Sequence, residues 1–125
     1  MEEKHLSDRF CNLVTEICEN ELNEIVVASP VLEEYLRTNY PKYKYISSTT
    51  KCLKKPEDAT NELEKDYLRV CLDYNLNHNM TFLNNLSEDL KEKVEFLINP
   101  ICGANCPNRE RHYKLNSLGT LNYGK

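Results

Sequence analysis

Four short apolar runs separated by helical patterns constrain the fold of this chain more than any other feature of its sequence. The runs cover residues 24–28, 43–47, 68–72 and 94–98 and are rich in β-branched, aromatic and leucine side chains. Strands and helices therefore alternate, which requires right-handed crossovers and a parallel sheet with the helices packed outside it. We predict an α/β fold of about four consecutive β/α units, either part of a (β/α) barrel or a small open sheet.

Helices are expected before and between these strands. Residues 5–20 carry apolar side chains at helical spacing, which predicts an amphipathic helix with one face turned to a core. Cys11 and Cys18 lie seven residues apart on it and are expected to be small buried hydrophobes, as is Cys71 in the third strand. Residues 54–58 and 87–93 are predicted as polar turns, and further helices are expected over residues 30–37, 60–67, 79–86 and 109–115. Residues 1–115 are then expected to form a single domain that is part of a larger barrel, and 116–125 a loosely ordered tail.

Composition excludes several classes of protein. The chain has 125 residues, of which 40% are hydrophobic, and it contains no run of about 20 apolar residues such as a membrane helix needs. A net charge of -4 argues against binding to nucleic acid. The first 20 residues lack the apolar core of a signal peptide, so we expect a cytoplasmic protein with reduced cysteines rather than a disulfide framework.

Polar side chains follow each predicted strand, at the edge where the carboxyl ends of parallel strands meet. Hydroxyl groups and backbone donors after the second strand could hold an anion whose charge Lys51 would balance. If so, the substitution Lys51→Ala should weaken anion binding and leave the melting temperature nearly unchanged. The predicted ligand-binding residues at this edge are Ser47, Ser48, Thr49, Thr50, Lys51, Asp73, Asn75, Asn77, Asn99 and Arg109. The competing interpretation is an ordinary set of polar loops and Asx-rich turns.

Two cysteines and a histidine follow the fourth strand closely. Cys102 and Cys106 have a spacing that zinc or an iron–sulfur cluster accepts, and His112 is near enough in sequence to join them. Cys52, after the second strand, is the natural candidate for a fourth ligand. The alternative is a cysteine nucleophile with His112 as its base, for which the sequence offers no orienting third residue.

Several segments together resemble an uncharacterised bacterial family of (β/α)-barrel proteins found mostly in gut anaerobes. The resemblance rests on residues 3–8, 11–12, 29–30, 33–37, 40–41, 47–51, 72–77 and 102–113. It implies a barrel fold with a site at the strand ends, and further strands before Met1 in the parent domain. More distantly, the paired cysteines after a strand are similar to the collagenase-like peptidase family, whose relatives include iron–sulfur proteins. This chain lacks that family's glycine-rich surroundings.

These observations predict a barrel-type protein that binds a small polar or anionic ligand at the strand ends, with zinc or an iron–sulfur cluster as the candidate cofactor. The sequence does not establish whether the protein is an enzyme. The alternative is a non-catalytic fragment or interaction module that completes its fold with a partner. A closed barrel of this type has eight strands and only four are predicted, so we expect self-association or a larger parent protein to cover the two edges.

Overall fold

The computed structural model describes residues 3–100 and 102–121 and confirms the α/β fold. Within these residues it contains a four-stranded sheet of β1 (Glu24–Val27), β2 (Lys44–Ser47), β3 (Arg69–Cys71) and β4 (Val94–Glu95), in the order β1-β2-β3-β4. Every pairing is parallel, and the register places Val27 beside Ser47, Ser47 beside Val70, and Val70 beside Val94. Sequential parallel strands of this kind are the arrangement of consecutive β/α units.

Helices connect the strands, with starts that the sequence explains. In α2 (Pro30–Asn39), Ser29 is the N-cap and accepts a hydrogen bond from the Leu32 N–H, while Pro30 occupies the first turn. The helix α3 (Pro56–Leu63) also begins with proline, so residues 56–58 are helical where we predicted a turn. Asn79 caps α4 (Met80–Asn85) by accepting from the Phe82 N–H. The predicted turn at 87–93 contains a further short helix, α5 (Glu88–Glu92).

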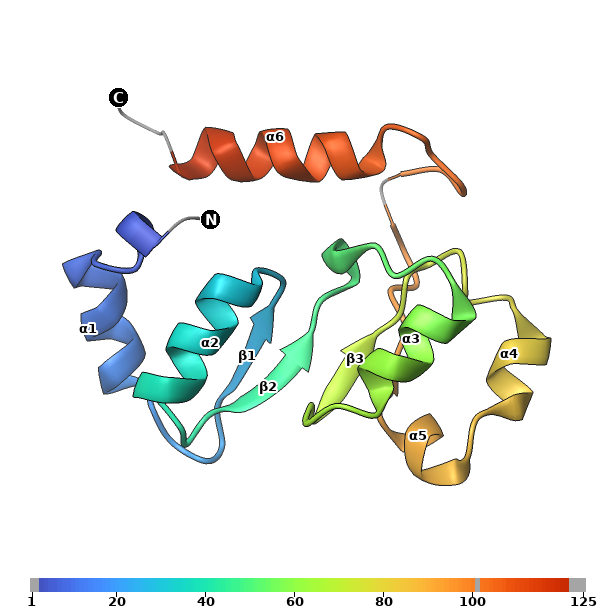
Figure 1. Ribbon diagram of the computed structural model, residues 1–125, viewed down its shortest axis with the longest axis horizontal. Helices are drawn as coiled ribbons and strands as arrows, with labels where there is room; N and C mark the ends of the chain where they lie inside the picture. Colours follow the sequence, from blue (N-terminus) through green and yellow to red (C-terminus); the bar gives the residue numbers. More distant parts are fainter. Residues whose placement is uncertain (1–2, 101, 122–125) are drawn as a thin grey trace.

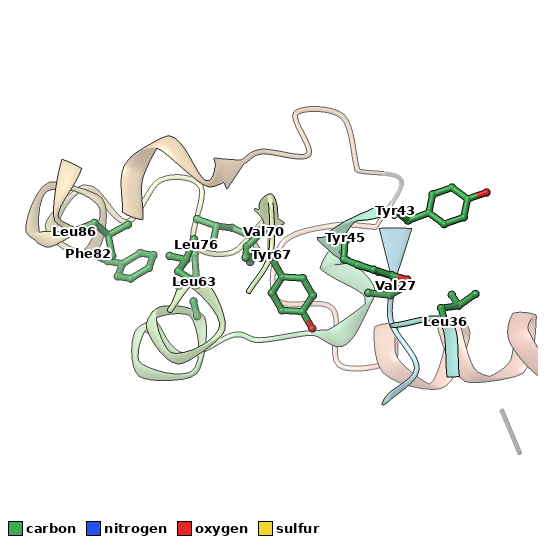
Figure 2. Packing of buried hydrophobic residues seen from close by; sticks show 12 residues of the cluster. Val27, Leu36, Tyr43, Tyr45, Leu63, Tyr67, Val70, Leu76, Phe82 and Leu86 are labelled. Atoms are coloured by element: carbon green, nitrogen blue, oxygen red, sulfur yellow. The ribbon is translucent and has the colours of Figure 1, made fainter. Parts of the chain in front are cut away.

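The core lies between the sheet and one layer of helices. Val27, Tyr45, Val70 and Leu72 alternate with side chains of the other face and are at most 5% exposed. They pack in one cluster with Leu36 of α2, Leu63 of α3 and the α4 side chain Phe82. Figure 2 shows this cluster as an elongated row from Leu86 and Phe82 at one end to Leu36 at the other. Burial of this row holds α2, α3 and α4 on a single face of the sheet.

The first helix departs most from expectation. It is α1 (Arg9–Ile17), preceded by the short η1 (Glu3–His5), and every residue of α1 keeps exposed surface. The predicted apolar face is present, but Phe10 is 74% and Ile17 73% exposed, so it does not turn to the core. Cys11 and Cys18 are likewise exposed, and their predicted burial is wrong. The helical spacing predicted the helix correctly. Its apolar face, however, does not pack against a core among the described residues.

The carboxyl-terminal third also differs from its pattern. We predicted strand over residues 94–98, but only Val94 and Glu95 pair with β3, and Ile98 is 91% exposed. The last helix, α6 (Arg109–Leu121), continues six residues into the predicted tail, and residues 122–125 lie outside the described part of the chain. Figure 1 shows α6 across the end of the molecule toward which the strand arrows point. This placement brings α6 onto the edge where sites form in such folds.

The second face of the sheet carries a charged row. Arg69 of β3 forms ion pairs with Glu24 of β1 and Glu95 of β4, and its Nε lies 3.3 Å from the Glu95 carboxylate without the alignment of a hydrogen bond. On the same face Val26 at the edge is 62% exposed, whereas Ile46 in the central β2 is buried. Cys71, between buried Val70 and Leu72, points to this face and is only partly buried, so its predicted core position is wrong.

Among the described residues, no helix is long and apolar enough to cross a membrane.

Candidate functional site

An ion pair between Asp73 and Arg109 lies at the centre of the strand-end edge. Asp73 follows β3, and Arg109 is the first residue of α6, 36 positions further along the chain. The Arg109 Nη2 donates to the Asp73 carboxylate, and both side chains are at most 1% exposed. We predicted both residues as ligand-binding from their positions after the strands, and the structure brings them into direct contact.

The loop 102–108 covers this pair. The Tyr74 ring lies against the Arg109 guanidinium, 4.1 Å from Cζ to the ring centroid, and the Tyr74 hydroxyl donates to the Gly103 carbonyl at 3.1 Å. The Asn75 Oδ1 accepts from the Asn105 N–H at 2.9 Å. Asn75 in turn donates its own N–H to Asp73 at 3.0 Å. The Asx-rich segment after β3 therefore attaches the loop to the sheet and orients the carboxylate at the same time.

Arg109 is incompletely paired despite its burial. Among the described residues, its Nε and Nη1 have no hydrogen-bond partner. Burial would lower the pKa of Arg109, but the neighbouring Tyr74 and the Asp73 carboxylate outweigh it, so the pKa is raised and the guanidinium stays charged. A buried N–H donor without an acceptor costs about 1–3 kcal/mol. Two such donors on one side chain mark the position at which an additional acceptor would be most favourable.

The four predicted metal ligands do not assemble. Within residues 3–100 and 102–121, no group of three or more His, Cys, Asp or Glu side chains is arranged to hold a metal ion. Cys102 and Cys106 lie in the covering loop and are partly buried, while His112 is exposed on α6. Cys52 lies near Arg109 with a left-handed backbone (φ 56°), and burial raises the pKa of its thiol, against the opposing effect of the Arg109 guanidinium. A protonated thiol is a poor metal ligand and a poor nucleophile.

Lys51 is occupied inside the fold rather than presented to an anion. Its Nζ donates to Glu62 at 2.7 Å, to the Tyr67 hydroxyl at 2.8 Å and to Glu33 at 3.3 Å. Its side chain is 14% exposed, and two carboxylates neutralise its charge. Ser47, also predicted as ligand-binding, is 1% exposed and donates to Glu62 at 2.6 Å. The hydroxyl-rich segment after β2 thus contributes to a polar network on the helix side of the sheet.

This network perturbs its own titrating groups. Burial would raise the pKa of Glu62, but hydrogen bonds from Lys51, Lys65 and Ser47 outweigh it and lower the pKa to about 2. Burial and the hydrogen bond that its hydroxyl donates to Glu33 raise the pKa of Tyr67 to about 12. Each carboxylate is therefore held charged and the phenol neutral, which favours a structural network joining α2, α3 and β2 over a reactive site.

Sequence reasoning missed Glu33, Glu62 and Tyr67. Glu33 lies four residues before Arg37 and pairs with it at 3.0 Å, a spacing visible in the sequence. Glu62 has a similar local partner in Lys65, three residues later, but nothing in the sequence selects it, among several acidic residues nearby, as the partner of Lys51. Tyr67 had no such signal.

The remaining predicted residues have local roles. Ser48 caps η2 (Thr49–Lys51) by accepting from the Thr50 N–H, and Thr49 donates to the Leu72 carbonyl at 2.9 Å, joining the ends of β2 and β3. Asn77 donates to the Leu97 carbonyl at 3.1 Å, and Asn99 is exposed. These contacts fit the interpretation of Asx-rich and hydroxyl-rich turns. Of the ten predicted ligand-binding residues, Asp73, Asn75 and Arg109 form one cluster.

In comparisons with known proteins, no family model, no curated protein and no solved structure matches this chain.

Proposed function

We propose that the chain is a β/α-type binding protein that takes a small polar or anionic ligand at Arg109, on the strand-end edge. The observation that carries the proposal is the pair of unpartnered N–H donors, Nε and Nη1, on a side chain that is 1% exposed. A ligand oxygen that accepts from them would remove a desolvation cost of about 1–3 kcal/mol per donor. Carboxylate and phosphoryl oxygens are strong acceptors for a guanidinium, and each of the two free donors can take one such oxygen.

The charge around Arg109 limits the ligand class. Asp73 already balances the guanidinium, so the buried pair is neutral overall. A ligand with a single negative charge, or a neutral carbonyl, therefore fits better than a polyanion, because Arg109 is the one buried cation among the described residues. Nε and Nη1 are enclosed, so a ligand can reach them only if neighbouring groups move.

Calorimetric titration with acetate, phosphate and neutral acetamide tests this proposal. In the variant Arg109→Lys an ammonium remains beside Asp73 but the Nε and Nη1 donors are lost, so we expect at least about tenfold weaker binding of acetate, the cost of one charged hydrogen bond. The matched control is Arg111→Lys, an exposed arginine two residues along the same helix, which should bind as the wild type does. Circular dichroism establishes that both variants fold.

Two results would overturn the proposal. One is a wild-type protein that binds none of the three probes at millimolar concentration. The other is equal affinity in the folded Arg109→Lys and wild-type proteins, which would mean that the unpartnered donors do not contact the ligand.

A further inference from the structure

An exposed apolar stripe and a partly apolar groove lie at opposite ends of the fold. The first is the α1 stripe, formed by side chains that recur at helical spacing and are 44–74% exposed: Phe10, Leu13, Val14 and Ile17. The second is the β4 groove, a hollow of about 290 Å³ lined by Leu83, Asn84, Leu86, Lys91, Val94 and Phe96. Apolar surface of this kind, contiguous on one helix face, is characteristic of an interaction site.

The α1 helix is fixed in a position beyond the β1 edge of the sheet. The Tyr35 hydroxyl of α2 donates to Asn12 at 3.1 Å, and the Tyr43 hydroxyl donates to the Thr15 carbonyl at 2.7 Å. Figure 1 shows α1 at the blue end of the molecule, beyond α2 and β1. In a β/α sheet each helix covers the junction of two neighbouring strands, so α1 has β1 on one side and a position for another strand on the other.

In a pair of copies, the edge strand β4 of one copy could occupy the free position beside the edge strand β1 of the other. β1 and β4 each pair on one side within the described residues, and both run in the same direction. A β4 strand from a second copy, placed beside β1, would extend the parallel sheet. A two-fold axis along the strands repeats the contact at the other edge and closes both sheets into eight strands.

We propose that two copies of this chain form such a closed dimer, in which α1 of each copy lies in the β4 groove of the other and β1 pairs with the other copy's β4. This pairing also gives residues 96–98 the neighbour they lack. Beyond Glu95 the adjacent β3 has ended at Cys71, so the predicted strand cannot continue on that side. The inference is independent of ligand binding at Arg109.

Charge and area both favour a second copy as the occupant. Arg9 and Glu16 border the α1 stripe beside Phe10 and Leu13, and Lys91 borders the β4 groove, so in the proposed dimer Glu16 would lie opposite Lys91. The exposed apolar side chains brought to the contact are Phe10, Leu13, Val14, Ile17, Val26, Phe96, Leu97 and Ile98. At about 150–200 Å² for a large side chain, their exposed parts amount to roughly 800 Å² per copy, the share of one partner in a standard interface.

Sedimentation equilibrium of the full chain from 1 to 100 µM tests the dimer. We expect a species of twice the 14.7 kDa chain mass. Leu13→Asp, at 52% exposure, should shift the protein to monomer, because two unpaired carboxylates would be buried per dimer. The matched control is Leu115→Asp on α6, where the leucine is 53% exposed but lies outside the proposed contact, and this variant should remain dimeric.

A charge exchange provides a second test that does not depend on an apolar substitution. Glu16→Lys should weaken the dimer about tenfold, since two pairs are lost per dimer, and combining it with Lys91→Glu should restore the wild-type affinity. A monomeric wild type at 100 µM, equal dissociation by Leu13→Asp and Leu115→Asp, or growth into assemblies larger than dimers would each overturn the proposal. So would failure of Lys91→Glu to rescue Glu16→Lys.

Discussion

Replacing Glu62 by glutamine should destabilise the fold in a manner that depends on pH. The Glu62 carboxylate is 4% exposed and accepts hydrogen bonds from Ser47 at 2.6 Å, Lys51 at 2.7 Å and Lys65 at 2.5 Å. Its pKa falls from an ordinary 4.5 to about 2 in the folded protein. Glutamine keeps the shape but cannot carry the charge, so Lys51 would retain Glu33 as its one carboxylate partner besides the Tyr67 hydroxyl.

The magnitude follows from linkage between protonation and folding. Because the folded pKa is depressed, the contribution of Glu62 is fully present above pH 4.5 and is lost as the pH falls through about 2. A shift of this size corresponds to roughly 2–3 kcal/mol after allowance for partial solvent screening. Glu62→Gln should therefore lower the free energy of unfolding by that amount at pH 7. The difference from the wild type should shrink steadily between pH 4.5 and 2.

Urea denaturation at several pH values measures this difference. The slope of the free energy with urea should be equal in both proteins, since the surface exposed on unfolding is unchanged. Glu57→Gln, an exposed residue of the same helix, serves as the control and should change stability by less than about 0.5 kcal/mol. A cost below that limit for Glu62→Gln, or parallel loss of stability by wild type and variant in acid, would refute the linkage.

Two further outcomes can be measured on the same preparations. Tyr67→Phe should lower the free energy of unfolding by about 1–2 kcal/mol at neutral pH, because it removes the hydroxyl between Lys51 and Glu33. Since the pKa of Tyr67 is raised to about 12 in the folded protein, this contribution is complete below pH 10 and disappears as the pH rises through 12. A constant difference in stability over that range would contradict the prediction. Alkylation followed by peptide mass mapping should modify the exposed Cys18 well before the partly buried Cys71, whose thiol pKa is raised by burial, and faster modification of Cys71 would contradict its burial.

Most of the secondary structure could be predicted from the sequence because it depends on the local pattern of residues. The runs containing Val26, Tyr45, Val70 and Val94 all form parallel strands, and proline and serine at 29–30 start α2 as expected. Element ends were less accurate. Residues 96–98 carry strand-forming side chains, but a strand also needs a neighbour to pair with, and β3 supplies one only as far as Cys71.

The order of the strands predicted where the cluster of Asp73, Asn75 and Arg109 lies, but only the tertiary structure shows which residues contact one another in it. Asp73, Asn75 and Arg109 could be placed at one edge because parallel strands end together, and the structure joins them through the Asp73–Arg109 pair. Nothing in the sequence distinguished Arg109 from Arg111, two residues later. The difference is that Arg109, the first residue of α6, contacts Asp73 and is buried whereas Arg111 is exposed, and only the tertiary structure decides this.

Lys51 shows most clearly where sequence alone determines a property and where it does not. The hydroxyl-rich run before Lys51 predicted that this residue lies just after β2, and the structure confirms it. Its partners, Glu33 and Glu62, are 18 and 11 residues away in sequence and come from two different helices. Local pattern is set by neighbouring residues and so can be read along the chain. The pairing of charges depends on which helices pack together, so the tertiary structure alone determined that Lys51 lies between Glu33 and Glu62.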